Sequence, residues 1–309
     1  MALFIHLTDR DEAGWAEALK AQLNGYPVYR RGDSFDRADI RYALVWKPAP
    51  DTFDGLNLKA ILSLGAGVDG LLRHPKLPNV PIVRFVDDEL SQCMADYVVA
   101  HVAMHQRLHT RFMADQQARR WVQHYPAPAT DLCVGVMGLG VIGMKAVEEL
   151  KPLGYALRGW SRTMKTIEGV ACFTDLERFL SGVDILVCLL PLTKETDGIL
   201  DYGAFQTLRR GPLLGGPVVI NAARGGHQRE GDLVRALTDG TLGAASLDVF
   251  EVEPLPQDSP LWTLPNCYVT PHIAAISNEG NGARYFARVV REHEAGKPLP
   301  NVVDLTRGY

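Results

Sequence analysis

The sequence predicts an α/β protein built from two doubly wound parallel-sheet domains. Strand-like and helix-like segments alternate from one end of the chain to the other, which favours parallel strands joined by helical crossovers. With 309 residues, 47% of them hydrophobic, the chain can form two domains with separate cores. A long helical segment without Pro or Gly, from Ser91 to about Arg120, separates two series of such elements.

The elements can be placed in order along the chain. The first series contains a helix over Glu12–Leu23 and three strands, at Leu3–Leu7, Tyr42–Trp46 and Ala60–Leu64. The second series contains six strand candidates, at Leu132–Met137, Tyr155–Trp160, Ile185–Leu189, Pro217–Asn221, Gly243–Leu247 and Cys267–Val269. A last helix is predicted over Glu279–Ala295. The division that follows is a central domain, 97–275, and a second domain formed by 1–96 together with 276–309.

Composition excludes several classes of protein. A net charge of −4, with 22% charged residues, is not the basic footprint of a nucleic-acid binder. The five cysteines have no metal-ligand or disulfide spacing, which indicates reduced thiols in the cytoplasm and no metal site. The N-terminal segment has no basic region before its apolar residues, and no segment has the length of a membrane span. We therefore expect a soluble cytoplasmic protein.

The pattern GxGxxG occurs twice, in different contexts. Gly138, Gly140 and Gly143 directly follow the apolar strand LCVGVM and open the helix VIGMKAVEELK, with Leu139, Val141 and Ile142 between them. This strand–turn–helix order is what a dinucleotide pyrophosphate requires. The second set, Gly65, Gly67 and Gly70, precedes only a short helix. There we expect either a tight turn or a nest of backbone N–H groups, with Ala66, that binds a carboxylate.

The residues after the second strand of the central domain indicate which nicotinamide is used. An NAD-preferring site carries an acid at this position for the ribose hydroxyls, but the segment YALRGWSRTMK has none. Ser161, Arg162 and Lys165 stand there instead, and a guanidinium suits a 2′-phosphate. We predict NADPH as the preferred cofactor, with NAD possible; a solvated basic turn is the alternative.

Three further segments carry residues suited to acid–base chemistry. They are VVINAARGG with Arg224, ASLDVFEVEPLP with Asp248 and Glu253, and YVTPHIAAIS with His272. Each follows a predicted strand, at the edge of the sheet where open α/β sheets bind ligands. Taken singly, the histidine could be structural and the arginine a surface residue. Their shared placement downstream of the dinucleotide loop favours a catalytic set.

Together these motifs resemble the D-isomer-specific 2-hydroxyacid dehydrogenase family, and within it the glyoxylate/hydroxypyruvate reductase A branch. The resemblance covers nearly the whole chain, through ALVWKP, LKAILSLGAGVD, VGVMGLGVIG, RGWSRT, LDVFEVEPLP, TPHIAAI and the terminal RGY. It implies a Rossmann cofactor domain, 97–275, inserted into a smaller flavodoxin-like, substrate-binding catalytic domain, 1–96 plus 276–309. It also implies NADPH-dependent reduction of a small anionic 2-oxo acid, glyoxylate or hydroxypyruvate.

The resemblance assigns a role to each matching residue. Arg224 is implied to bind substrate, His272 to act as the acid/base and Glu253 to be its carboxylate partner. Asp248 is placed near the nicotinamide, and further cofactor contacts are implied at Leu190, Pro191, Thr196, Ala222 and Ala223. The implied substrate-binding residues are Trp46, Gly65, Ala66, Gly67 and Arg84, although a core Trp and a surface Arg are alternatives.

The chain departs from the family at one point, and two other functions stay open. Many members have Gly-Gly two residues after the histidine, where this chain has Ala274 and Ala275, so the size of the pocket is in doubt. The alternatives are another D-2-hydroxyacid dehydrogenase, of lactate or phosphoglycerate type, and a non-catalytic dinucleotide-sensing protein like the family's corepressors. The family also implies a homodimer, with the long helix at the interface and Trp121 beyond it.

Overall fold

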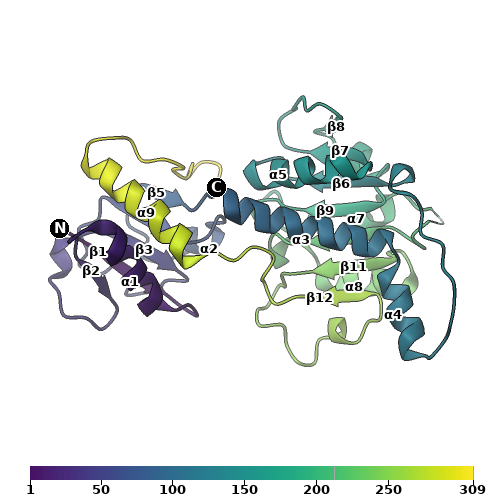
Figure 1. Cartoon of the computed structure of the whole chain (residues 1–309), viewed down its shortest axis with the longest axis horizontal. Helices are drawn as coiled ribbons and strands as arrows, with labels where there is room; N and C mark the ends of the chain where they lie inside the picture. Colours follow the sequence, from purple (N-terminus) through teal and green to yellow (C-terminus); the bar gives the residue numbers. More distant parts are fainter. Residues whose placement is uncertain (212, 309) are drawn as a thin grey trace. The chain divides into compact units, whose positions relative to one another are not determined.

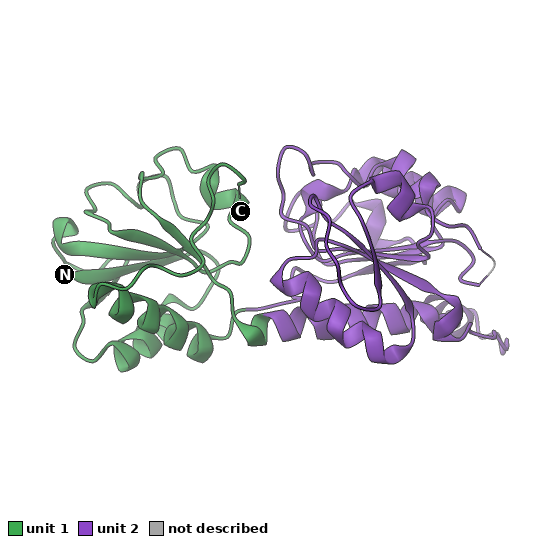
Figure 2. Cartoon of the chain, turned by 90° about the horizontal axis from the view of Figure 1, so that it is seen from above, with its two compact units in different colours: residues 1–90, 277–309 green, residues 91–276 purple. Residues whose placement is uncertain are grey.

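The chain forms two compact units, which Figure 2 shows in green and purple. The computed structural model describes residues 1–211 and 213–308. Unit 1 consists of Met1–Leu90 and the chain from Ser277 onward, and unit 2 consists of Ser91–Ile276. The sequence analysis places these boundaries at 96/97 and 275/276, whereas the units meet at 90/91 and 276/277.

Unit 1 is built on a five-stranded sheet in the order β2-β1-β3-β4-β5, with every pairing parallel. Its strands are β1 (Ala2–Leu7), β2 (Val28–Arg30), β3 (Ile40–Trp46), β4 (Ala60–Ser63) and β5 (Ile82–Arg84). Its helical segments are α1 (Glu12–Leu23), η1 (Arg37–Asp39), α2 (Asp69–Leu72) and α9 (Glu279–Glu294). The prediction omitted β2 and β5, each of three residues.

Helices α1 and α9 pack against each other, although they come from opposite ends of the chain (Figure 1). The Asp11 carboxylate caps α1 by accepting hydrogen bonds from the N–H groups of Ala13 and Gly14, both at 3.1 Å. Trp15 of α1 is 2% exposed and lies so close to Gly282 of α9 that a Cβ there would overlap its ring. Every residue of β1 is buried, as expected for a parallel sheet covered on both faces.

Unit 2 is built on a seven-stranded parallel sheet in the order β12-β11-β10-β9-β6-β7-β8. Its strands are β6 (Cys133–Met137), β7 (Ala156–Trp160), β8 (Val170–Phe173), β9 (Ile185–Cys188), β10 (Val218–Asn221), β11 (Ala244–Leu247) and β12 (Cys267–Val269). The order reverses between β6 and β9, which is the switch point at which doubly wound sheets bind dinucleotides. The prediction of two doubly wound parallel-sheet domains is therefore confirmed.

The helices of unit 2 correct one prediction. They are α3 (Asp88–Gln106), α4 (His109–Gln117), α5 (Val141–Leu150), α6 (Leu176–Leu180), α7 (Tyr202–Thr207) and α8 (Glu230–Asp239), with 3-10 segments η2 (Ala129–Asp131), η3 (Lys151–Leu153), η4 (Gly225–His227) and η5 (Pro260–Trp262). A single helix over Ser91–Arg120 is wrong, because Leu108 takes a left-handed conformation, φ +58°, that separates α3 from α4.

None of the helices in residues 1–211 and 213–308 combines the length and the apolar character that crossing a lipid bilayer requires.

Candidate functional site

The predicted cofactor and catalytic residues of unit 2 share one edge of its sheet. All seven strands are parallel, so their carboxyl ends lie at the same edge. The glycine loop follows β6, Ser161 follows β7, Leu190 follows β9, and Ala222 follows β10. Asp248 and Thr270 follow β11 and β12. This edge of unit 2 is therefore where a ligand site is expected.

The three glycines of the loop after β6 serve different purposes. Gly138 has a φ of +100°, and a Cβ there would lie 2.6 Å from the carbonyl oxygen of Leu189. A Cβ on Gly143 would overlap the carbonyl oxygen of Gly138. A Cβ on Gly140, in contrast, would meet nothing within 4 Å. The chain's own packing explains Gly138 and Gly143, and the open space at Gly140 is what a pyrophosphate would occupy.

The N-terminus of α5 fits an anion. Gly140 is the N-cap residue, and no side chain caps the first N–H groups of this helix, which leaves them available to a phosphate. Val141 is 55% exposed. Leu139, in contrast, is buried against Gly159, and Ile142 packs against Met94 and other apolar side chains. Val141 therefore faces solvent, whereas Leu139 and Ile142 hold the loop in place.

The basic residues after β7 lie beside this loop. Lys165 donates a hydrogen bond to the carbonyl oxygen of Leu139, so its ammonium is held against the glycine loop. The Ser161 hydroxyl donates to the carbonyl oxygen of Thr163 at 2.8 Å. Arg162 is exposed. These groups and the uncapped helix fit the phosphates of a dinucleotide.

The guanidinium of Arg162 interacts electrostatically with an acid that was not among the predicted site residues, Glu195. Glu195 belongs to the segment after β9 and not to the end of β7, where an NAD-preferring site carries its acid. A hydrogen bond from Thr193 lowers the pKa of Glu195, and the positive charge of Arg162 lowers it further. The net positive charge beside the predicted phosphate site is therefore smaller than Arg162 and Lys165 alone would give.

The segment after β9 is closed by Thr196. Its buried hydroxyl donates to the carbonyl oxygen of Pro191 at 2.7 Å and accepts from the N–H of Thr193 at 2.8 Å. Leu190 is buried as well, at 8% exposed. Thr196 therefore stabilises the loop through hydrogen bonds, and Leu190 stabilises it through packing.

The segment after β10 is shaped by Asn221. Its side chain donates to the carbonyl oxygen of Arg224 at 3.0 Å and accepts from the N–H of Ala223 at 3.1 Å. Ala222 and Ala223 are buried, whereas Arg224 is half-buried, and its Nη1 donates to the carbonyl oxygen of Ala223 at 2.7 Å. A side chain at Gly225 would overlap the backbone of Phe250, so only glycine fits after the arginine.

His272 and Glu253, which the family resemblance pairs, lie within hydrogen-bond distance of each other. Nδ1 of His272 lies 2.8 Å from Oε2 of Glu253, and Oε1 of Glu253 accepts from the N–H of Phe250 at 3.1 Å. A carboxylate can only accept, so Nδ1 carries the proton and Nε2 is directed to other partners. His272 itself has a φ of +54°, an uncommon conformation for this residue. The contact between Nδ1 and the Glu253 carboxylate is the arrangement that an acid/base histidine needs, because it leaves Nε2 for the substrate.

Asp248 positions the backbone around this histidine. It is 1% exposed, and its carboxylate accepts from the N–H groups of Ile273 and Ala274 at 2.8 and 2.9 Å and from the Thr270 hydroxyl at 2.6 Å. Its carbonyl oxygen accepts from the N–H of His272 at 2.8 Å. The resemblance placed Asp248 near the nicotinamide; the structure shows that it fixes the turn that carries His272.

Unit 1 brings its own predicted residues together at the carboxyl edge of its sheet. Trp46 ends β3, and its ring lies against Gly65, where a Cβ would come within 2.5 Å of Cζ3. Ala66 and Gly67 continue the same half-buried turn after β4. Arg84 ends β5, and its carbonyl oxygen accepts from the Tyr285 hydroxyl at 3.2 Å.

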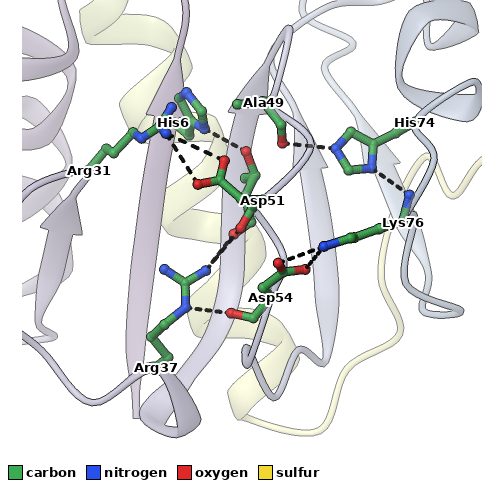
Figure 3. Close-up of polar contacts among 9 residues, drawn as sticks. His6, Arg31, Arg37, Ala49, Asp51, Asp54, His74 and Lys76 are labelled. Carbon is green, nitrogen blue, oxygen red and sulfur yellow. Dashed lines mark hydrogen bonds and ion pairs between the residues drawn. The ribbon is translucent and has the colours of Figure 1, made fainter.

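The loop that leads away from Trp46 is anchored by charged side chains (Figure 3). Arg31 approaches the Asp51 carboxylate at 3.3 Å, and Lys76 approaches that of Asp54 at 2.7 Å. Arg37 donates to the carbonyl oxygens of Asp54 and Thr52.

Two histidines complete this cluster. His6 Nδ1 lies 2.7 Å from the Thr52 hydroxyl, and His74 Nε2 lies 3.0 Å from the carbonyl oxygen of Ala49 (Figure 3). Because the groups in the cluster bind one another or the loop backbone, we interpret it as an anchor for the loop and not as a second site.

The sequence analysis missed several residues on which the site depends. Asn221, Thr270 and His227 shape the segments that carry Arg224, His272 and Pro191. Asn221 stands at the end of a strand, directly before AARGG, so its position was a signal that could have been used. Asp248, which Thr270 contacts, and Pro191, which His227 contacts, are distant in sequence and gave no such signal.

Comparison with known proteins places these observations in a family. Residues 99–274 match the family described as "D-isomer specific 2-hydroxyacid dehydrogenase, NAD binding domain". The chain is similar to the glyoxylate/hydroxypyruvate reductase A of Enterobacter sp. (strain 638), with 39% identity over 318 residues and 99% of each chain covered.

Two solved structures resemble the chain over its full length. One is a probable 2-hydroxyacid dehydrogenase from Rhizobium etli CFN 42 in complex with NADP, HEPES and L(+)-tartaric acid, with a TM-score of 0.92, 45% identity and coverage of 100% of this chain and 99% of that one. The other is an NADPH-dependent glyoxylate/hydroxypyruvate reductase from Sinorhizobium meliloti in complex with NADP and sulfate, with a TM-score of 0.92, 40% identity and the same coverage. The matched family region, the full-length relatives and the paired His272 and Glu253 lead to one conclusion: the chain belongs to the D-isomer specific 2-hydroxyacid dehydrogenase family.

Proposed function

We propose that the protein uses NADPH to reduce a small 2-oxo acid, glyoxylate or hydroxypyruvate, to the 2-hydroxy acid. The observation that carries this proposal is the 2.8 Å contact between His272 and Glu253 at the carboxyl edge of a doubly wound sheet. The named activity of the Enterobacter and Sinorhizobium relatives supports the choice of substrate. NADP in both structural neighbours supports the choice of cofactor.

In the proposed reaction NADPH, when bound, would supply the hydride that reduces the carbonyl carbon. Negative charge then develops on the carbonyl oxygen, and Nε2 of His272 delivers a proton to that oxygen. Glu253 holds the ring through Nδ1 and stabilises the imidazolium before transfer. Arg224 binds the carboxylate of the substrate and lowers the energy of the developing alkoxide through its permanent charge.

The proposed cofactor contacts extend along the carboxyl edge of unit 2. Gly138–Gly143 would hold the pyrophosphate at the N-terminus of α5, and Ser161, Arg162 and Lys165 would hold the 2′-phosphate. Leu190, Pro191 and Thr196 would line the adenosine side, with Ala222, Ala223 and Asp248 toward the nicotinamide.

The proposed substrate contacts from unit 1 are the turn Gly65–Ala66–Gly67, Trp46 and Arg84. The packing of Trp46 on Gly65 supports a small substrate, since a bulky ring already covers this turn. Ala274, which is 4% exposed, belongs to the same apolar cluster as Ala222. Its methyl group takes space that a glycine would leave open.

A panel of 2-oxo acids assayed with NADPH and with NADH tests the proposal. We expect the highest kcat/KM with NADPH and glyoxylate or hydroxypyruvate. A preference for pyruvate or for a phosphorylated hydroxy acid would instead assign the protein to the lactate or phosphoglycerate type. Binding of NADPH without any turnover would favour the non-catalytic sensor.

We further propose that the protein is a cytoplasmic homodimer. Large apolar side chains are exposed together on α4 and the segment after it: Phe112, Met113, Trp121, Val122 and Tyr125. Trp121 is 97% exposed and Tyr125 is 84% exposed. Large apolar side chains exposed so near one another in sequence are a candidate interface, and a second copy of the chain would cover them.

A further inference from the structure

His227 is a fully buried titratable residue that the proposed reaction does not use. It lies in η4, three residues after Arg224, and is 0% exposed. Its backbone carbonyl oxygen accepts from the N–H of Leu200 at 2.8 Å, and that of Gly226 accepts from the N–H of Gly198 at 2.8 Å. The backbone of η4 is therefore anchored along residues 198–200.

Both ring nitrogens of His227 face carbonyl oxygens from two different loops. Nδ1 lies 3.1 Å from the carbonyl oxygen of Arg224, and Nε2 lies 3.2 Å from that of Pro191. A carbonyl oxygen can only accept a hydrogen bond, and a neutral imidazole has a single N–H to donate. Both contacts are favourable at once only when the ring carries a proton on each nitrogen. A neutral ring would leave one lone pair against a carbonyl oxygen in a site that water does not reach.

The surroundings of His227 support the doubly protonated ring. Burial alone would lower its pKa, but the Cys188 thiol of β9 and the two carbonyl oxygens raise the pKa above its ordinary value overall. Two other buried histidines of unit 2 show the opposite result. Burial lowers the pKa of His101 to about 4 and that of His105 to about 3, and each ring bonds to the Ser246 hydroxyl, which can donate or accept.

We propose that His227, as an imidazolium, is a positioning residue that ties the segment carrying Arg224 to the segment carrying Pro191. The first segment follows β10 and the second follows β9, so the ring bridges two neighbouring loops at the carboxyl edge of the sheet. The Asn221 side chain holds the same Arg224 carbonyl oxygen from the other side, at 3.0 Å. The consequence for catalysis rests on the proposed function, in which Arg224 binds substrate.

The protonation state can be measured without any assay of activity. In ¹⁵N-histidine-labelled protein, long-range ¹H–¹⁵N spectra distinguish an imidazolium, with two equivalent N–H nitrogens, from a neutral tautomer. We expect an imidazolium signal at pH 7 that is absent from His227→Gln and retained in His272→Ala. A neutral tautomer for the assigned His227 ring at pH 7 would overturn the proposal. If His227→Gln does not fold, through-bond assignment of the histidine rings of the wild type identifies the His227 signal instead.

The positioning role is tested by kinetics with a matched control. His227→Gln keeps an amide that can donate to one carbonyl oxygen but removes the charge and the second bond. We expect the KM for glyoxylate to rise about 10- to 100-fold, the range for a lost charge-assisted hydrogen bond, with a smaller change in kcat. His105→Gln is the control, because His105 is similarly buried in the same unit and contacts neither loop. It is expected to lose stability without a change in KM.

The pH profile separates a charged bridge from simple packing. In wild type, KM should rise at high pH as His227 loses its second proton. In His227→Gln, KM should be high at all pH values and this step should disappear. A His227→Gln enzyme with the wild-type KM and pH profile would refute the positioning role. A wild type that reduces none of the 2-oxo acids would refute the proposed function, while the spectra would still decide the protonation of His227.

Discussion

At the scale of single residues, His272 is the group on which turnover should depend most. Its Nδ1 is held by Glu253, so Nε2 is the nitrogen available to a substrate oxygen. We expect His272→Ala to lower kcat by about 10²- to 10⁴-fold, the usual contribution of a general acid, while leaving the Kd for NADPH unchanged. Stopped-flow turnover and fluorescence titration measure the two quantities. His109→Ala, an exposed histidine of α4, is the control, and equal activity of the two variants would contradict the assignment.

A second residue-scale prediction concerns the choice of cofactor. Arg162 is exposed beside the glycine loop, and its charge acts on Glu195. We expect Arg162→Ala to lower kcat/KM with NADPH by about 10- to 150-fold, which corresponds to a charge-assisted phosphate contact of about 1.5–3 kcal/mol. The efficiency with NADH should change little.

Glu195→Gln should act in the opposite direction, because it removes a negative charge that faces the same guanidinium. We expect a lower KM for NADPH and an unchanged KM for NADH. The exposed Arg178 of α6 supplies the control variant Arg178→Ala. Equal losses with both cofactors in Arg162→Ala would show that Arg162 does not contact the 2′-phosphate.

Much of the candidate site could be predicted from residue types at the ends of strands, and some of it could not. The pairing of His272 with Glu253 was implied by the family resemblance, and it gives the second nitrogen of a catalytic imidazole the acceptor that it needs. Glu195 was not predicted, because the acid of an NAD-preferring site stands at the end of the second strand, β7, whereas Glu195 follows β9. The packing of Leu139 was missed because GxGxxG gives the order of the loop but not the direction of each side chain.

At the scale of elements, the contact between α3 and β11 makes stability depend on pH. His101 and His105 of α3 both bond to Ser246 of β11, and burial lowers their pKa values to about 4 and about 3. The unfolded chain binds a proton at each ring near pH 6.5. Stability is therefore fully present above pH 6.5 and is lost as pH falls from there toward the folded pKa values. At pH 5 each ring should lower the free energy of unfolding by about 2 kcal/mol.

Denaturant unfolding of wild type and His101→Gln at pH 7.5 and pH 5 checks this expectation. His101→Gln should unfold more readily at pH 7.5 but lose less of its stability on acidification. His109→Gln, at an exposed position of α4, removes only the smallest of the causes that lower the pKa of His105 and should nearly retain the wild-type pH dependence. An acid-induced loss of the same size in wild type and His101→Gln would contradict the buried neutral ring.

The elements also show where periodicity is a sufficient guide. The fully buried strands and the helices α1 and α9 were predicted within a few residues, because each shows an apolar pattern over several positions or turns. The short strands β2, β5 and β8 were not predicted, although β12, also of three residues, was. The break at Leu108 has neither Gly nor Pro to indicate it; it results from packing, since Leu108 is buried in the core of unit 2.

At the scale of the whole molecule, the exposed aromatic side chains of unit 2 lead to a prediction about assembly. We expect the wild type to sediment as a dimer at micromolar concentration. The double variant Trp121→Ser, Tyr125→Ser should sediment as a monomer, because it removes two of the largest exposed apolar side chains after α4. Met164→Ser, at an exposed Met after β7 that is remote in sequence from α4, should remain dimeric. A monomeric wild type in analytical ultracentrifugation would exclude the proposed homodimer.

The division of unit 1 between the two ends of the chain has a consequence for biosynthesis. A ribosome delivers Met1–Leu90 first, then all of unit 2, and only at the end the segment that forms α9. Until then Trp15 lacks Gly282, and Tyr42 lacks the Glu294 carboxylate that accepts from its hydroxyl at 2.8 Å. The apolar surface of the nascent N-terminal segment therefore stays exposed until α9 is synthesised. Exposed apolar surface of this kind is what a chaperone binds. Expressed separately, residues 91–276 should show protected amides in hydrogen exchange, whereas residues 1–90 should exchange rapidly until a peptide of residues 277–308 is added.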